Sequence, residues 1–423
     1  MATNDTGRPF IEVHLDAPEL GPCERVGKLF PAETRVDLPP SFEYAREWLN
    51  STRVFQLDPH LDVYAGEQHA RLAPGFGIFL DSAPDRWGRV LMERREALQA
   101  SREGRRTRRL TDLDFLLGVH DFTRTGALRF RRGPEQAFLD DHDLPAPPVT
   151  DLRELAAIAT KLDEPGVESL PEYEKWLSML MAPGTSLGGA RPKASFTQVD
   201  GTLWLAKFPG HDDRRDWGAW EYLTHQMARD AGIDVPKSEL LDLGGRYRTF
   251  CVQRFDRGAG GEPAGRRMYA SAITLLGRQD GQEGASYLDL AELIETEGGA
   301  GLAEDLRQLF RRAVFNLQVG NRDDHLRNHG FIREPSGWRL SPAFDMNPNP
   351  DKDVHALTWD GASGAPDLQV LRSAAAFFRI TDSGEAQRIL DEVNAVVRGW
   401  RQRAAALKLP RAEIQLMDSV FAV

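Results

Sequence analysis

The chain has 423 residues, 41% of them hydrophobic, so it can bury a large core and is long enough for two or three domains. Its formal net charge of −11 argues against a surface built mainly to wrap nucleic acid. The two cysteines, Cys23 and Cys251, form no disulfide framework or metal-ligand pattern. The start MATNDTGRPF is polar, and no apolar run is long enough to cross a bilayer. We therefore expect a soluble cytoplasmic protein.

The first 148 residues are predicted to form a mixed α+β unit. The alternating runs IEVHLD and VFQLD suggest strands, and a helix is expected near WGRVLMERREALQ. The unit ends in the proline-rich connector DDHDLPAPPVT. Residues 153–181 then show apolar positions at helical spacing, and the glycine-rich loop GTSLGGARPK follows them.

A sheet with one helix is predicted for the remainder of residues 149–256. KASFTQV and TLWLAKF are two β-rich runs joined by Asp200-Gly201, which is a strong hairpin signal. WGAWEYLTHQMARDAG predicts a helix closed by Gly232, and LLDL and YRTFCVQRF predict two more strands. This order of strands and one helix is typical of a small lobe built around a β-sheet.

Residues 257–423 are predicted to be mainly helical. Leu302, Leu306, Phe310 and Val314 recur every four residues and form a buried stripe that runs into Gly320-Asn321. HGFIREPSGWRL is a plausible hairpin with Pro335-Ser336-Gly337 at its tip, and another helix is expected over about residues 386–407. The whole order resembles the two lobes of a protein kinase with an extra domain in front.

The stretch NRDDHLRNHGFI concentrates acidic, amide and imidazole groups. His325 and His329 have the spacing of a zinc-protease helix, but Leu326 stands where the catalytic Glu is required. FDMNPNPD begins like a calcium loop, yet Pro350 replaces the turn glycine and Ala356 the final Glu. Neither metal reading fits.

Phosphoryl transfer fits this stretch better. It requires a base Asp, an Asn five residues on for magnesium, and a second metal-binding Asp after a short hairpin. Asp323, Asn328 and Asp345 have that spacing. Asp323 would orient the acceptor hydroxyl, while Asn328 and Asp345 would hold Mg²⁺ against phosphate oxygens. His325 lies inside the loop and is expected to brace its backbone; the alternative is a polar loop held by its own side chains.

The upstream half supplies candidates for the nucleotide site. Lys207 ends the second hairpin strand, and Glu221 lies on the next helix, where pairing with Lys207 is expected within a kinase frame. VQRFDR ends the sheet where a hinge should contact adenine, through Gln253 and Phe255. Phe255 is a candidate to stack on the base, with a core aromatic as the alternative.

The glycine-rich loop precedes the hairpin, where a loop that covers the phosphates belongs. It is no Walker A loop, because Ala190 stands where that pattern requires Lys. Gly188 and Gly189 provide backbone freedom, and Lys193 adds a cation for the nucleotide.

Together these motifs resemble the HipA family of kinase toxins from bacterial toxin–antitoxin modules. The resemblance rests on SLGGARPK, LAKFP, VQRFDR, NRDDHLRN and SPAFDMNP, with APDRWGR in the first domain, all in the family's order. Two departures stand out: Gln253 replaces the family's usual Glu, and Asp324 replaces its common small residue.

The resemblance implies a protein-kinase-like α+β fold. Residues 1–148 would be an accessory N-terminal subdomain, 149–256 the mixed-sheet N-lobe and 257–423 the helical C-lobe. It also implies an ATP- and Mg²⁺-dependent serine/threonine protein kinase that autophosphorylates on the loop serine, Ser186, and arrests growth. The expected partner is a small helix-turn-helix antitoxin, through which alone DNA would be bound. In some members the substrate is an aminoacyl-tRNA synthetase.

Two other functions remain open from the sequence. Lipid kinases share these lobes, although the acidic charge and the absence of a membrane-binding helix speak mildly against a lipid substrate. A non-catalytic corepressor that acts through its partner is the other, and Lys207, Asp323, Asn328 and Asp345 argue against it. Residues 89–109 hold eight arginines against three glutamates, which indicates either a nucleic-acid contact or a solvated helix face.

Overall fold

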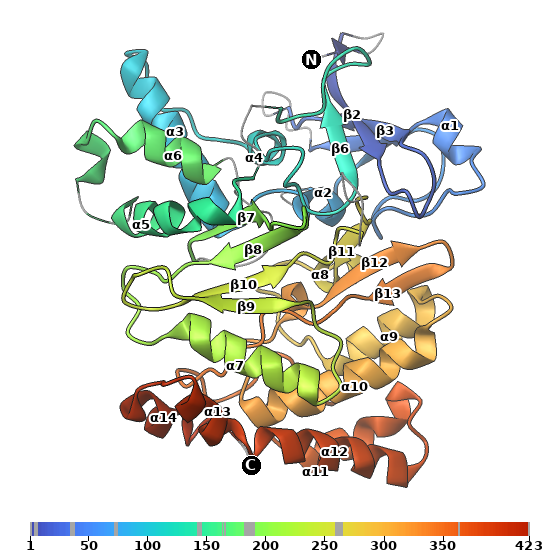
Figure 1. Cartoon of the computed structure of the whole chain (residues 1–423). Coiled ribbons are helices and arrows are strands. Elements are labelled where there is room, and N and C mark those ends of the chain that lie inside the picture. The colour runs from blue at the N-terminus through green and yellow to red at the C-terminus, as the bar shows by residue number, and fades with distance from the viewer. Residues whose placement is uncertain are drawn as a thin grey trace. The chain divides into compact units, whose positions relative to one another are not determined.

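The computed structural model describes residues 2–3, 7–33, 39–71, 75–141, 146–162, 164, 166–181, 191–258, 265–362 and 364–421. The chain divides into two compact units (Figure 1). The first unit consists of Met1–His211 with Asp256–Ala270, and the second of Asp212–Phe255 with Ser271–Val423. The three ranges expected from the sequence, with boundaries after 148 and 256, stay a prediction.

An antiparallel sheet organises the beginning of the first unit. Its strands run in the order β1-β2-β3-β4-β5, and β6 pairs with β2. They are β1 (Ala2–Thr3), β2 (Pro9–Leu15), β3 (Glu24–Phe30), β4 (Ser41–Tyr44), β5 (Glu67–His69) and β6 (Leu128–Arg131). The predicted strand IEVHLD is confirmed as the main part of β2, in which Ile11, Val13 and Leu15 are buried.

The prediction of a second strand in this region, at VFQLD, is wrong. Residues 54–58 are irregular, although Leu57 is fully buried. The reason is Asp58, whose carboxylate accepts the N–H of Ile78 at 3.0 Å and the N–H of His60 at 2.9 Å. A carboxylate that satisfies backbone donors of a turn and of α2 (Gly77–Leu80) favours a loop over a strand ladder.

The helices of the first unit follow the sequence pattern with one added break. The unit contains α1 (Arg46–Leu49), α2, α3 (Arg86–Arg102), α4 (Asp112–Leu117), η2 (Val149–Asp151), α5 (Leu152–Leu162), η3 (Val167–Ser169) and α6 (Tyr173–Met181). The predicted helical stretch 153–181 is thus two helices, separated where Gly166 takes a left-handed φ of 81°.

The predicted hairpin is confirmed as β7 (Lys193–Thr197) and β8 (Leu203–Lys207), paired from Lys193 opposite Lys207 to Thr197 opposite Leu203. Gln198 donates its N–H to Thr202 O, so three residues form the connection. Gly201 lies in the loop with a φ of 79°, a conformation that costs glycine little.

The second unit is mainly helical. It begins with α7 (Trp217–Asp230) and the antiparallel pair β9 (Ser238–Leu241) and β10 (Thr249–Gln253), while β11 (Tyr269–Ser271) lies at the boundary of the units. The rest comprises α8 (Ala272–Leu275), α9 (Tyr287–Glu297), α10 (Leu302–Val319), η4 (Leu326–Asn328), β12 (Gly330–Glu334), β13 (Gly337–Leu340), α11 (Leu368–Ser373), η5 (Ala374–Phe378), α12 (Ser383–Val397), α13 (Trp400–Ala406) and α14 (Arg411–Met417).

Helix α10 is central to the second unit, where it packs against α9 and α12 (Figure 1). The predicted stripe is confirmed, because Leu306, Phe310 and Val314 are fully buried and Leu302 is half-buried. The predicted hairpin after it is confirmed as β12 and β13, whereas the helix expected over 386–407 is two helices, α12 and α13. Within the described ranges, no helix combines the length and apolar character that a bilayer crossing requires.

Candidate active site

The candidate catalytic loop begins where α10 ends at Gly320. This glycine has a left-handed φ of 64°, and a Cβ in its place would lie 2.5 Å from Val420 Cγ1 and from Val420 O. Both constraints require glycine. The loop then runs from Asn321 through η4 to His329, immediately before β12. A rigid helix therefore delivers the loop that contains the predicted base.

Asp323 and Asp324 are neighbours with opposite environments. The Asp323 side chain is 56% exposed and forms an ion pair with Lys352. The Asp324 side chain is 5% exposed. Its Oδ2 accepts hydrogen bonds from the Tyr287 hydroxyl and, at 3.1 Å, from Asn316 Nδ2. Asp323 is thus accessible to an acceptor substrate, and Asp324 is not.

A buried cluster surrounds Asp324, formed by Tyr287 of α9, Asn316 of α10 and His329. Nε2 of His329 lies 3.0 Å from Asp324 Oδ2. Burial opposes ionisation of Asp324, but the charge and hydrogen bond of His329, with help from Tyr287, outweigh it and lower the pKa of Asp324. Burial and the nearby Asp324 carboxylate raise the pKa of Tyr287. The cluster thus holds an ionised carboxylate under the loop.

A histidine and a tryptophan from the segment after Asp345 also pack on this cluster. Nδ1 of His355 lies 3.1 Å from Asn321 O, and burial lowers the pKa of His355 to about 4. The ring is therefore neutral at pH 7, and Nδ1 donates to the carbonyl. Trp359 stacks on Tyr287 with centroids 5.4 Å apart and touches His355 edge-on at 4.8 Å.

The two predicted metal ligands lie on the loop and on the segment after β13. Asn328 is buried, and its amide donates to Asp323 O at 3.4 Å, which connects the two motif positions across the loop. Asp345 has a left-handed φ of 57°, rare for a residue with a Cβ and common at functional sites. Nδ2 of Asn347 lies 3.5 Å from Asp345 Oδ1.

The side-chain oxygens of these two residues suit Mg²⁺ better than a metal ion whose ligands all come from the protein. Across the residues that the structure describes, no group of three or more His, Cys, Asp or Glu is arranged to hold a metal ion. Magnesium usually takes one or two carboxylates or related oxygens and obtains its other ligands from water and phosphate. Asn328 and Asp345 would supply such a partial set.

The other predicted residues of the second unit have mixed surroundings. His325 is exposed, and its carbonyl accepts the N–H of Asn328 at 2.8 Å. Glu221 is 6% exposed on α7, and the N–H of Gln253 donates to Lys237 O at 2.8 Å. The half-buried ring of Phe255 lies 5.5 Å from that of Phe344, directly before Asp345. The hinge candidate and the metal motif therefore touch.

In the first unit, Lys207 is half-buried at the end of β8. Lys193, predicted to bind the nucleotide, is 1% exposed, and its Nζ lies 2.5 Å from Asp85 Oδ2. Asp85 is the N-cap of α3 and belongs to the APDRWGR motif. This ion pair engages the ammonium group within the first unit, and binding of the nucleotide by Lys193 stays a prediction. Ser186, Gly188 and Gly189 lie outside the described residues.

At least four of the eight arginines in residues 89–109 form ion pairs within the first unit. Arg89 pairs with Asp112 at 3.0 Å and Arg108 with Asp114 at 3.0 Å. Arg105 pairs with Glu96 at 2.5 Å. Further arginines of the run bind Glu174 and the carbonyl of Leu162. These contacts favour a solvated helix face over a nucleic-acid contact.

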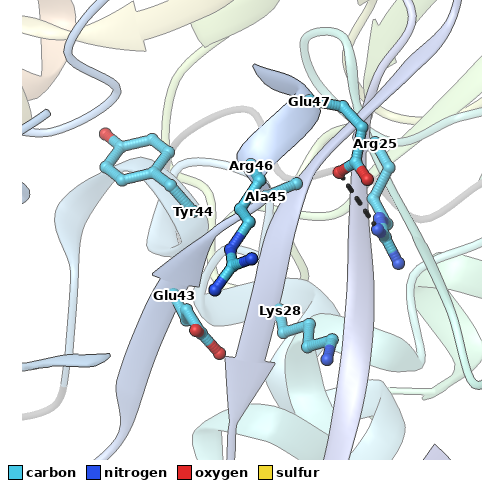
Figure 2. Close-up of a pocket in the computed structure, with 7 residues that line it drawn as sticks. All are labelled: Arg25, Lys28, Glu43, Tyr44, Ala45, Arg46 and Glu47. Carbon is cyan, nitrogen blue, oxygen red and sulfur yellow. Dashed lines mark hydrogen bonds and ion pairs between the residues drawn. The ribbon is translucent and has the colours of Figure 1, made fainter. Parts of the chain in front are cut away.

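A pocket of about 200 Å³ lies elsewhere in the first unit (Figure 2). Its lining is Arg25, Lys28, Glu43, Tyr44, Ala45, Arg46 and Glu47. Arg25 Nη2 donates to Glu47 at 3.3 Å, which leaves Lys28 and Arg46 facing the single further carboxylate of Glu43. None of the predicted site residues lines this pocket, so it has no part in the candidate active site.

Sequence reasoning missed the residues that support the loop. Asn316 carried a signal, because a polar side chain on the buried face of α10 requires a hydrogen-bond partner. His329 was considered only as a zinc ligand. Tyr287 and Lys352 lie 37 and 29 residues from their carboxylate partners, and no local pattern connects them.

Comparison with known proteins gives a consistent result. Residues 185–400 match the family described as HipA-like C-terminal domain. The chain is 26% identical over 227 residues to the serine/threonine-protein kinase toxin HipA of Shewanella oneidensis, covering 47% of this chain and 50% of that protein. It is 28% identical over 136 residues to a putative kinase of Haemophilus influenzae, covering 30% of this chain and 39% of the relative. The chain thus spans half or less of the length of these curated relatives.

The fold extends over more of the chain than the sequence likeness does. The solved complex of Shewanella oneidensis HipA with HipB and operator DNA contains a chain that matches with a TM-score of 0.66 and 20% identity. The match covers 97% of this chain and 94% of that chain. It confirms the predicted protein-kinase-like α+β fold. Because the family match also covers just over half of the residues, the chain belongs to the HipA family.

Proposed function

We propose that the chain is an ATP- and Mg²⁺-dependent serine/threonine protein kinase that acts as the toxin of a HipA/HipB-like toxin–antitoxin module. The observation that carries the proposal is the pair Asp323 and Asp324. One carboxylate is buried and fixes the loop, and the other is exposed, five residues before Asn328. A phosphoryl-transfer site requires such an accessible base on a rigid loop beside metal ligands.

Each residue then has one role. Asp323 accepts the proton of the acceptor hydroxyl and orients its oxygen. Asn328 and Asp345 would hold Mg²⁺, which would neutralise phosphate charge. Lys207 binds the nucleotide phosphates, Glu221 supports nucleotide binding, and the segment of Gln253 and Phe255 contacts adenine. His325 braces the loop through its backbone. Positioned charge supplies most of the catalysis in this reaction.

The family suggests the acceptor and the partner. We expect autophosphorylation on Ser186 and phosphorylation of a cellular protein, with an aminoacyl-tRNA synthetase as one candidate. The Shewanella chain was solved with HipB and operator DNA, which supports a HipB-like helix-turn-helix partner for this chain. The ion pairs within the arginine run support DNA contact through that partner rather than directly.

The central test is a transfer assay with labelled ATP. The full chain is incubated with Mg²⁺ and labelled ATP alone, with a bacterial protein extract, or with phosphatidylinositol vesicles. We expect label in protein only, and mass spectrometry should locate phosphate on Ser186. Label in the lipid alone would favour a lipid kinase. No transfer, together with operator binding beside the neighbouring gene product, would favour the corepressor.

Asp345→Asn should weaken Mg²⁺-dependent nucleotide binding. A hard dication prefers a charged oxygen, and removing even a residue that supports a metal ligand costs about 10- to 100-fold in affinity. We therefore expect the ATP dissociation constant with Mg²⁺ to rise at least about tenfold, measured by calorimetry with and without the metal. Asp351→Asn, an exposed carboxylate paired with Arg215, is the control. Unchanged magnesium dependence would remove Asp345 from the site.

A further inference from the structure

We propose that Lys352 is a further catalytic residue, whose ammonium group stabilises the charge on the phosphoryl group as it passes to the acceptor at Asp323. This inference rests on the proposed function. Lys352 follows Asp345 by seven residues and belongs to none of the motifs recognised in the sequence. It is the side chain that the structure pairs with the predicted base.

The pair faces outward, where a substrate can reach it. Nζ of Lys352 contacts Oδ1 of Asp323, and the two side chains are 47% and 56% exposed. An exposed ion pair contributes little to stability, typically up to about 1 kcal/mol. Stability therefore gives only a weak reason for a lysine in this place, whereas an accessible cation beside a base suits the recognition of phosphate.

The backbone near Lys352 is fixed to the catalytic loop independently of the lysine side chain. Arg322, directly before Asp323, donates from Nη1 to Lys352 O at 2.6 Å and to Asn349 O at 3.3 Å. The N–H of Asn349 donates to Gly320 O at 2.9 Å, and the N–H of Ala356 donates to Arg322 O at 3.2 Å. These bonds position the Cα atom of Lys352, so its side chain is presented to Asp323 rather than meeting it by chance.

The chemistry favours a cation at this place. The acceptor oxygen forms a bond to the γ-phosphorus while the bond to the β–γ bridging oxygen breaks and its electron pair leaves on ADP. The hydroxyl proton passes to Asp323. The acceptor oxygen lies between the base and the phosphorus, so the flexible side chain of Lys352, held at Asp323, is within reach of the transferring group. A positioned cation there lowers the energy of the transition state.

The opposite role for the same contact is inhibition, in which Lys352 blocks the base until it is displaced. The two roles predict effects of opposite sign. Loss of the ammonium group lowers turnover if Lys352 is catalytic and raises it if Lys352 is a block.

The experiment compares Lys352→Met, Lys352→Arg and the wild-type chain, with Lys175→Met, an exposed lysine on α6, as the matched control. Transfer to protein is measured as kcat and as KM for ATP, and ATP affinity with Mg²⁺ is measured by calorimetry. For Lys352→Met we expect kcat to fall about 10²- to 10³-fold, with ATP affinity unchanged. Lys352→Arg should restore at least a tenth of wild-type kcat, and Lys175→Met should match the wild type.

The outcomes separate this inference from the proposed function. A Lys352→Met variant with wild-type or higher kcat overturns the catalytic role of Lys352, provided that the wild type is active and Asp323→Ala is not. Equal losses in kcat and in ATP affinity for Lys352→Met and Lys352→Arg would also overturn it, since such losses indicate general damage to the site. A wild-type chain that transfers no phosphoryl group to protein overturns both proposals.

Discussion

Asp323→Ala is expected to abolish phosphoryl transfer while ATP binding survives. A positioned base contributes about 10²- to 10⁴-fold to such a reaction, so kcat should fall by about 10³-fold. The Asp323 side chain is more than half exposed and pairs with an equally accessible lysine, so its removal leaves the buried cluster beneath the loop intact. Binding of ATP rests on other residues, and its affinity should stay within about twofold because the lost interaction acts on the acceptor.

The measurement is single-turnover transfer of labelled phosphate to protein, with calorimetry of ATP and Mg²⁺ on the same samples. Asp391→Ala, an exposed carboxylate on α12 that accepts from Gln387, is the control for a lost surface charge. Near-normal transfer by Asp323→Ala would end the assignment of Asp323 as the base. Asp324 cannot take its place in this conformation, because its carboxylate is enclosed by Tyr287, Asn316 and His329.

The elements that the sequence predicts well have strong local signals. The apolar spacing of α10, the Asp200-Gly201 turn and the tip at Ser336-Gly337 each specify their structure within a few residues. VFQLD shows where a local pattern fails. Its alternation resembles that of a strand, but Asp58 bonds to the backbone of α2, twenty residues away. Such a tertiary contact overrides β-propensity and leaves no trace in the local sequence.

The residues of the candidate site also fall into those with a local sequence signal and those brought together only by folding. The spacing of Asp323, Asn328 and Asp345 is a property of the chain, so a motif can indicate it. Partners brought together by folding cannot be found in this manner. Lys193 is predicted to bind a nucleotide because it follows a glycine-rich loop, and nothing in the local sequence indicates its ion-pair partner Asp85, 108 residues away. Asp324, which the sequence suggested only as an unusual residue in the motif, is the centre of the buried cluster.

The largest effect on stability is expected for Asp324→Ala. Removing a buried carboxylate leaves its hydrogen-bond donors without a partner, which costs about 1–3 kcal/mol for each buried group left unsatisfied. Here these groups are the Tyr287 hydroxyl, the Asn316 amide and His329, all buried. In a unit of this size such a loss should lower the melting temperature on the order of 10 °C. Asp323→Ala, one residue away and exposed, should change it by no more than about 1 °C, since surface substitutions typically stay within about 0.5 kcal/mol.

Thermal unfolding followed by circular dichroism compares the two alanine variants, and Tyr287→Phe completes a double-mutant cycle with Asp324→Ala. Tyr287→Phe removes the hydroxyl that Asp324→Ala would leave unpaired, so the double variant should lose less stability than the sum of the two single losses, by at least about 0.5 kcal/mol. The pH dependence provides a second check. The pKa of Asp324 is lowered in the folded chain, so its ionised form stabilises the fold above the ordinary pKa of an aspartate, and this stability is lost as the pH falls through the lowered value. Strictly additive losses, or equal melting temperatures for Asp323→Ala and Asp324→Ala, would show that the buried cluster does not hold the loop.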